Sequence, residues 1–202
     1  FMYILGGRNS GGQLGDTEYS RLGSRTQTGI LDTWGTTTPL TFARRGHCTV
    51  AYNGYLYVAG GLTGIYETTV HYGPINPATG AVTSWTVTSP FATGRWQHGC
   101  AAYNGNFYVI GGADGAGNMS NVQKSIIASD GSLAAFTSAT TAPLPALRSY
   151  VAATAYNGSM YVTGGYNGTS VNEVLYAAIG ATGDITAWTP TTPFPFVRDS
   201  HA

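Results

Sequence analysis

Short apolar runs that end in a pair of glycines recur along this chain at intervals of about fifty residues. The copies occupy residues 1–7, 52–61, 103–112 and 156–165, and all but the first begin with Tyr-Asn-Gly. Asn-Gly supplies the positive-φ residues of a tight turn between two strands. Runs that are apolar on both alternating faces indicate strands covered on both sides. The pattern therefore predicts repeated β-hairpins stacked face to face.

The second half of each unit has an equally regular pattern. A glycine is followed five residues later by a large aromatic residue, in the pairs Gly29 and Trp34, Gly80 and Trp85, Gly131 and Phe136, and Gly183 and Trp188. A fixed aromatic position in each unit suits packing between stacked sheets, so we expect these four rings to be buried at equivalent places.

Each unit then continues through a Thr/Pro-rich connection to an arginine. These arginines are Arg44, Arg95, Arg148 and Arg198, and His47, His98, Val151 and His201 follow them by three residues. Functional groups are normally grafted onto particular sites and not onto every repeat. We therefore interpret the recurring Arg and His residues as contacts between repeats, and we predict no metal ligands among them.

The Gly-Gly run, the downstream Tyr and Trp, and the Pro-x-x-Arg-type junction together resemble the kelch repeat, in particular the secreted kelch-like repeats of bacterial type. The resemblance implies an all-β fold, a β-propeller of four-stranded antiparallel blades, of which four repeats are present. The units run approximately over 1–43, 44–94, 95–147 and 148–197, and 198–202 begin the next. Since kelch propellers usually have about six or seven blades, we interpret 1–202 as a single kelch-like domain or a fragment of a larger propeller. A complete four-bladed ring is the first alternative, and self-association of two chains to complete one ring is the second.

Charged residues make up only 9% of the chain, and the nine basic and nine acidic residues cancel. Nucleic acid is disfavoured as a partner because no basic field would attract it. Membrane insertion is disfavoured because no apolar run approaches about 20 residues. The single lysine and the hydroxyl-rich composition favour an extracellular or cell-surface protein.

The two cysteines are out of register in the repeat. Cys48 lies four residues before Tyr52, whereas Cys100 lies three before Tyr103. On equivalent strands, a one-residue offset places side chains on opposite faces. We therefore expect both cysteines to be unpaired.

The strongest candidates for recognition are two residues in each junction that differ from unit to unit. They are Arg45-Gly46, Trp96-Gln97, Ser149-Tyr150 and Asp199-Ser200. In an antiparallel blade these junctions emerge on the same face as the loops between strands two and three, of which 8–16 is the longest. The predicted binding residues are Arg45, Trp96, Gln97, Tyr150 and Asp199, with Arg8 and Asn9 from that loop.

No catalytic residue or cofactor is predicted. A Ser nucleophile elbow, a metal-binding helix motif and a phosphate loop are all missing from the sequence. The pattern favours a non-catalytic secreted or cell-surface module that recognises a protein or a glycan. Two alternatives stay open, a carbohydrate-active or galactose-oxidase-like copper enzyme domain and a self-assembling structural repeat protein.

Overall fold

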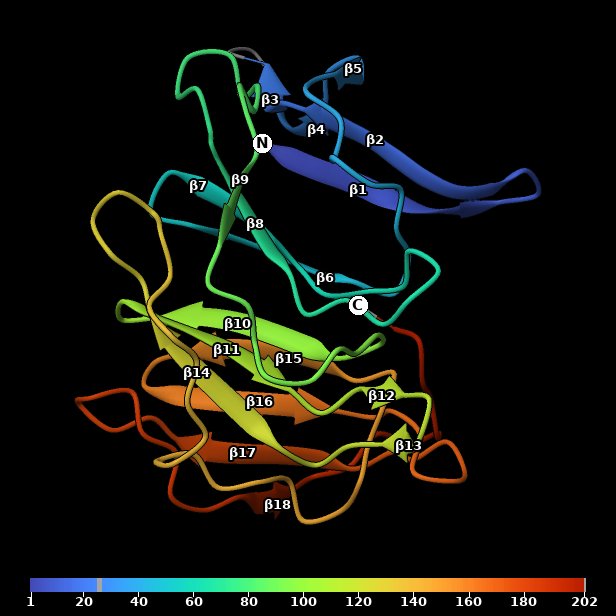
Figure 1. The fold of residues 1–202 in the computed structure, drawn as a ribbon, viewed down its shortest axis with the longest axis vertical. Coiled ribbons are helices and arrows are strands. Elements are labelled where there is room, and N and C mark those ends of the chain that lie inside the picture. The colour runs from blue at the N-terminus through green and yellow to red at the C-terminus, as the bar shows by residue number, and fades with distance from the viewer. Residues whose placement is uncertain (25–26, 202) are drawn as a thin grey trace.

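The computed structural model describes residues 1–24 and 27–201, and this part of the chain contains strands but no helix. Successive antiparallel sheets follow one another in chain order, from the blue N-terminal sheet to the red C-terminal sheet (Figure 1). The described residues thus contain no helix that could cross a lipid bilayer. The predicted all-β fold of antiparallel blades is confirmed.

The second and fourth blades are complete four-stranded sheets in simple sequential order. The second contains β6 (Cys48–Tyr52), β7 (Tyr55–Ala59), β8 (Val70–Pro74) and β9 (Thr86–Thr88). The fourth contains β15 (Ala152–Tyr156), β16 (Ser159–Thr163), β17 (Val174–Ala178) and β18 (Thr189–Thr191). As the repeats predict, the Asn-Gly turns join β6 to β7 and β15 to β16.

The first and third blades vary this plan. The third contains β10 (Gly99–Tyr103), β11 (Asn106–Ile110) and β14 (Val122–Ile126), with the hairpin β12 (Ala113–Asp114) and β13 (Gly117–Asn118) between β11 and β14. A bridge between Lys124 and Thr137 replaces its fourth strand. The first contains β1 (Met2–Asn9), β2 (Gly12–Ser20) and β5 (Gly35–Thr36), and β3 (Leu22–Ser24) pairs with β4 (Gln27–Leu31).

The apolar core lies between the blades. One cluster joins Tyr57 and Val70 of the second blade to Phe107 and Val109 of the third, all fully buried. Similar clusters lie between the first and second blades and between the third and fourth. Strands β7 and β11 are therefore buried on both faces, which is the physical reason for the apolar runs at 55–59 and 107–110.

A tyrosine in the second strand position ties each blade to the next. The hydroxyl groups of Tyr3, Tyr57 and Tyr108 donate to the carbonyl oxygens of Gly80, Gly131 and Gly183 at 2.7, 2.8 and 2.8 Å. At Gly131 the φ angle is +84°, and an added Cβ would lie 2.7 Å from the ring of Tyr55. Gly131 is thus required by the close approach of a neighbouring blade, and Gly80 and Gly183 are crowded in the same way.

The four repeated aromatic residues lie at the margins between blades. The indole nitrogens of Trp85 and Trp188 donate to the carbonyls of Thr38 and Ala142 in the preceding blade, at 2.9 and 3.0 Å. Trp85, Phe136 and Trp188 are only partly buried, and Trp34 is 37% exposed. The expectation that all four rings are buried thus holds only in part, because these rings precede the outermost strands and only one face of the first blade is packed against another blade of this chain.

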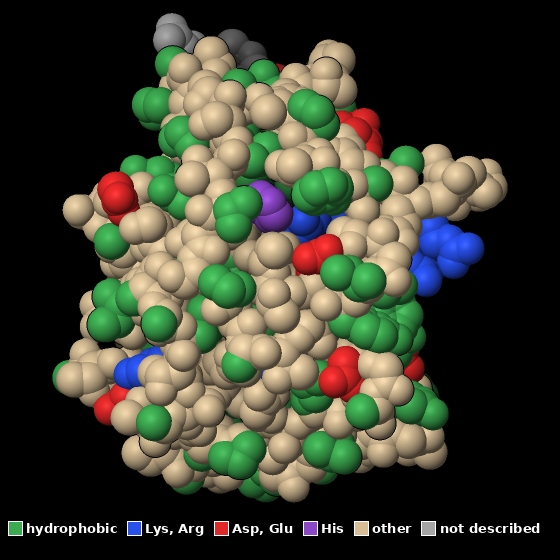
Figure 2. Space-filling view, viewed as in Figure 1, with side chains coloured by type: hydrophobic (Ala, Val, Ile, Leu, Met, Phe, Trp, Pro, Cys, Tyr) green, Lys and Arg blue, Asp and Glu red, His purple; other side chains and the backbone are tan. Residues whose placement is uncertain are grey.

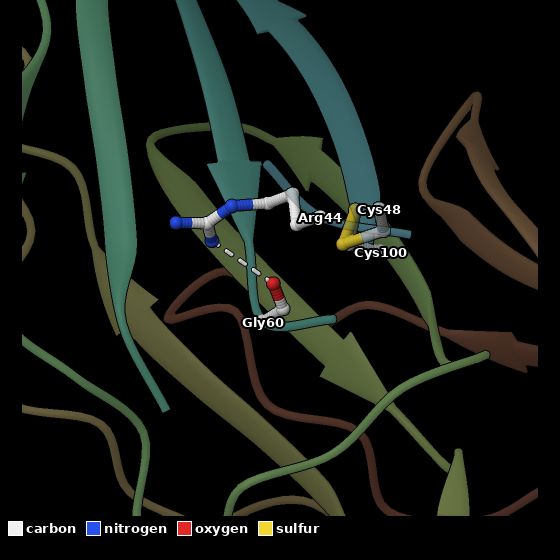
Figure 3. Close-up of a disulfide and its surroundings, with 4 residues drawn as sticks. All are labelled: Arg44, Cys48, Gly60 and Cys100. Atoms are coloured by element: carbon white, nitrogen blue, oxygen red, sulfur yellow. Dashed lines mark hydrogen bonds between the residues drawn. A yellow bond between two sulfur atoms is a disulfide. The ribbon is translucent and has the colours of Figure 1, made fainter. Parts of the chain in front are cut away.

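The recurring arginines take part in hydrogen bonds that hold successive units together. The second glycine of each pair donates its N–H to an arginine carbonyl of the next unit, in the pairs Gly7 and Arg44, Gly61 and Arg95, Gly112 and Arg148, and Gly165 and Arg198, at 2.8 or 2.9 Å. The first three arginines are at most 2% exposed. The guanidinium of Arg44 also donates to the Gly60 carbonyl at 3.0 Å (Figure 3). The arginines therefore link blades through their main-chain carbonyls, whereas the guanidinium groups of the first three bond within their own units.

Substitution of Gly60 should therefore disrupt the packing of the second blade on the third. A Cβ at this position would lie 2.7 Å from His98 Cε1 and 2.8 Å from the Arg95 carbonyl oxygen. We expect Gly60→Ala to lower the free energy of unfolding by about 3 kcal/mol in urea titrations. The control is Gly54→Ala, where φ is +83° but no atom lies within 4 Å. Equal losses in the two variants would show that backbone strain, and not crowding, determines the effect.

The cysteines are paired, so the expectation of free thiols was wrong. A disulfide joins Cys48 of β6 to Cys100 of β10, with the Cα atoms 5.9 Å apart (Figure 3). In face-to-face stacked blades, equivalent residues point the same way around the stack. Two side chains meet between neighbouring blades only when they lie on opposite faces of their own strands. The one-residue offset therefore aims the two sulfur atoms toward each other.

Candidate functional site

A pocket of about 350 Å³ opens where the junctions of successive blades come together. Its lining contains two consecutive residues from each junction: Gly46 and His47, Gln97 and His98, Tyr150 and Val151, and Ser200 and His201. We call this pocket and its rim the mouth. The first residue of each pair belongs to the variable positions of the sequence, and the second occupies the recurring His position. The mouth thus has two layers. The outer layer consists of the variable residues Gly46, Gln97, Tyr150 and Ser200, and the inner layer consists of His47, His98, Val151 and His201.

A relay of backbone hydrogen bonds fixes the outer layer. The N–H of Gln97 donates to the Gly46 carbonyl at 2.6 Å, that of Tyr150 to Gln97 at 2.7 Å, and that of Ser200 to Tyr150 at 3.3 Å. All four residues have φ between +55° and +60°. Such angles are uncommon for residues other than glycine and persist where the surroundings impose them. The backbone of the mouth is therefore held in one conformation by contacts from blade to blade.

Four aromatic side chains form a continuous row across the junctions. The ring centroids of Tyr66 and Trp96 are 6.4 Å apart, those of Trp96 and Tyr150 6.3 Å, and those of Tyr150 and Tyr166 6.5 Å. The Arg45 guanidinium lies over the Trp96 ring at 5.2 Å, a cation–π contact. Tyr66 and Tyr166 remain 37% and 38% exposed. We call Tyr66, Trp96, Tyr150 and Tyr166 the aromatic row.

The structure brings most of the predicted binding residues to the mouth. Trp96 contacts both Arg45 and Tyr150, and Gln97 lines the pocket. Asp199 directly precedes Ser200 and accepts a hydrogen bond from the Ser170 hydroxyl at 2.5 Å.

Arg8 and Asn9 lie farther from this group. They are at the end of β1, in a hairpin that extends beyond the second blade on the same side as β12 and β13 (Figure 1). No hydrogen bond or ring contact among the described residues joins them to the aromatic row.

Sequence reasoning missed two members of the row, Tyr66 and Tyr166. Both lie in the loops that follow a Gly-Gly pair, and these loops were expected on the same face as the junctions. Tyr166 forms a β-bridge with Ser149, and Tyr66 forms one with Leu62, which itself bridges to Arg45. The aromatic residue in the loops after Gly60-Gly61 and Gly164-Gly165 was thus the signal that could have identified them.

The histidines of the inner layer serve packing. Burial, and secondarily the charge of Arg95, lowers the pKa of His98 to about 3. Burial and Arg44 likewise lower the pKa of His47 to about 4. Both rings are therefore neutral at physiological pH. Among the described residues, no group of three or more His, Cys, Asp or Glu side chains is arranged to hold a metal ion.

The surface carries few charges. Figure 2 shows isolated Lys, Arg, Asp and Glu side chains on a face that consists mainly of uncharged atoms. Long-range attraction of a charged partner therefore contributes little. A ligand at the mouth would be held by the aromatic rings, by their polar edges and by the local charges of Arg45 and Asp199.

Comparison with known proteins agrees with this architecture. Residues 147–176 match the family described as Kelch motif. The chain is also 26% identical, over 157 residues, to Kelch-like protein 35 of Mus musculus, a match that covers 78% of this chain and 25% of the mouse protein. The chain thus spans about a quarter of the length of this curated relative. Kelch repeats generally mediate protein binding. Residues 147–176 therefore form a kelch motif, and the other units repeat its pattern in antiparallel sheets that are consistent with the blades of a kelch β-propeller.

Proposed function

We propose that this chain is a non-catalytic binding module that recognises a protein partner at the mouth. The observation that carries the proposal is the aromatic row, in which four rings from three blades contact one another at the surface. Trp, Tyr and Arg are the residue types enriched at binding hot spots, and the half-buried Trp96, Tyr150 and Arg45 are supported by the rigid relay beneath them.

The separation of framework from variable positions supports the same function. The buried arginines and the Gly-Gly carbonyl contacts recur in successive units, whereas Arg45, Trp96, Ser149 and Asp199 occupy one equivalent position with four different residues. Positions that hold the fold together must repeat, but positions that contact a partner are free to differ. The residues at this variable position lie beside the mouth.

We further propose a secreted or cell-surface location. The disulfide between Cys48 and Cys100 supports an oxidising compartment, because glutathione and thioredoxin keep most cytosolic thiols reduced. The composition, with a single lysine and abundant hydroxyl groups, agrees with this location. Fractionation of the natural host, followed by thiol alkylation before lysis, would test it.

Selection of ligands from a displayed peptide library against the whole chain tests the binding function. We expect the selected ligands to lose at least about tenfold in affinity for Trp96→Ala and for Tyr150→Ala, since hot-spot truncations cost about 2 kcal/mol or more. The matched control is Tyr156→Ala, a tyrosine that is 73% exposed and lies at the Asn-Gly turn, at the other end of the blade. Ligands that bind both mouth variants as tightly as the unmodified chain would place the binding surface elsewhere.

A further inference from the structure

The first and fourth blades lie at opposite ends of the stack, and each has one broad face that no other described blade covers (Figure 1). On the first blade, Met2 and Ile4 point to this open face, because the alternate residues Tyr3 and Leu5 pack against the second blade. Met2 and Ile4 are 45% and 50% exposed. The side chains at the same two positions of the other blades are fully buried: Leu56 and Val58, Phe107 and Val109, and Met160 and Val162. The open face of the first blade thus carries the apolar side chains of an interface between blades.

The open face of the fourth blade contains a groove of about 390 Å³. Its lining occupies the positions that, in the second blade, pack against the third blade. Ala152, Thr154, Tyr161, Thr163 and Phe194 of the groove correspond to Cys48, Val50, Tyr57, Ala59 and Phe91 of the cluster between those two blades. The groove is therefore one half of an interface between blades, and it has the shape that accepts the open face of another blade.

The contacts of Phe194 indicate which group belongs in this groove. Its equivalent in the second blade, Phe91, contacts one guanidinium and two rings, those of Arg95, His98 and Phe136, at 5.5, 5.8 and 5.8 Å. Phe194 makes the first two of these contacts, with Arg198 at 5.0 Å and with His201 at 5.9 Å. Among the described residues, no ring takes the third position, which the next blade supplies through Phe136 at the equivalent interface. An aromatic side chain of a further blade would complete the cluster around Phe194.

A hydrogen-bond donor on the same face also lacks a partner. The hydroxyl groups of Tyr57 and Tyr108 donate to glycine carbonyls of the next blade at 2.8 Å. Tyr161 stands at the same position of the fourth blade, and its half-buried side chain lines the groove. Within residues 1–24 and 27–201 its hydroxyl donates to no acceptor. The groove therefore requires both an apolar surface and a main-chain carbonyl at one defined place.

The first blade of this same chain has the matching groups. Trp34 occupies the position of Phe136 and is 37% exposed. Gly29 stands in the sequence at the position of the glycines whose carbonyls accept from the tyrosines. Together with Met2 and Ile4, these residues reproduce the pattern that the third blade presents to the second. Both halves of one interface are thus present in a single chain, at its two opposite ends.

We infer that copies of this chain associate head to tail, with the first blade of one copy packed into the groove on the fourth blade of another. The interface is heterologous, because two different surfaces meet in it. It uses the same positions as the three interfaces between blades within the chain, so it continues an established mode of packing. The mouth lies at the junctions, along the edges of the blades, and it stays open in this assembly.

Light scattering of the whole chain over a range of concentrations tests the inference. We expect the mass to rise with concentration from that of one copy to that of at least two. The variants Ile4→Asp on the first blade and Thr154→Arg, at an exposed residue of the groove, should each weaken the association at least about tenfold. The matched control is Ile126→Asp, because Ile126 is an exposed residue of the third blade, both faces of which are packed within the chain. It should associate like the unmodified chain.

A mixture of the two variants distinguishes this interface from one between identical faces. Ile4→Asp keeps an intact groove and Thr154→Arg keeps an intact first blade, so an equimolar mixture should form complexes of two chains. Urea midpoints verify that each variant is folded, and Met2→Lys replaces Ile4→Asp if that variant is not. An unmodified chain that remains a single copy at millimolar concentration would overturn the inference. A mixture that does not associate, or equal effects of Ile4→Asp and Ile126→Asp, would overturn it as well.

Discussion

Reduction of the Cys48–Cys100 disulfide should lower the free energy of unfolding by about 4 kcal/mol. The bond closes a loop between residues 52 positions apart, and such a loop restricts the unfolded chain strongly. It also joins β6 to β10, the innermost strands of two neighbouring blades, so its loss should loosen their contact. Urea unfolding with and without a thiol reductant measures the difference.

The double variant Cys48→Ala with Cys100→Ala is the control for this experiment. Its unfolding midpoint should be low and should not respond to reductant. Titration of the unmodified chain in denaturant without reductant should detect no free thiol. An unfolding midpoint that is identical in the two redox states would contradict the stabilising role of the bond.

Acid should destabilise the fold between about pH 6.5 and pH 4.5, by roughly 2 kcal/mol for each of His47 and His98 at the lower limit. The folded-state pKa of His47 is about 4 and that of His98 about 3, both below the ordinary value of 6.5. Above pH 6.5 these rings are neutral in the folded and unfolded states. As the pH falls below 6.5, the unfolded chain binds protons first, so stability is lost progressively until the folded-state pKa is reached. Urea midpoints measured across this range test the prediction.

The fourth blade provides the control for the acid effect. Val151 stands there at the position that His47 and His98 occupy in the second and third blades. In His98→Val, the loss of stability between pH 6.5 and pH 4.5 should be smaller by about 2 kcal/mol. Asp184 does not contribute to the stability change in this pH range. Hydrogen bonds from Lys124 and neighbouring hydroxyl groups lower the pKa of its carboxyl group, so the stability that it contributes is lost only at more acidic pH. An unchanged pH dependence would show that His98 does not contribute to acid unfolding.

The repeated pattern predicted the blades because it reports local constraints. Asn-Gly turns, runs apolar on both faces and the Gly-Gly ends each require one backbone conformation or one kind of burial. The role of the arginines was also predictable, since a buried polar group that recurs needs a recurring partner, here a glycine carbonyl such as that of Gly60. These features depend on neighbours within one unit or on its repetition.

Features that depend on how two blades face each other were harder to predict. The one-residue offset between Cys48 and Cys100 is present, as the sequence indicates. Between two stacked blades, however, this offset brings the two side chains together, whereas it had been taken to separate them. The exposure of Trp34 follows from its place in a terminal blade of this chain, which no local pattern records. Trp96 and Tyr150 were predicted as site residues, yet the loop residues Tyr66 and Tyr166 complete their row only through contacts across junctions.

The hydrogen-bond relay at the mouth has a consequence for engineering. Its links join main-chain atoms of Gly46, Gln97, Tyr150 and Ser200, so none of them depends on the chemistry of a side chain. Exchange of the side chains at 97, 150 and 200 should therefore alter specificity without loss of the supporting geometry, provided that each new residue tolerates a left-handed φ angle, as Asn and Asp do. A combinatorial library at these positions, combined with 45, 96 and 199, would turn the propeller into a scaffold whose recognition surface can be selected independently of its fold.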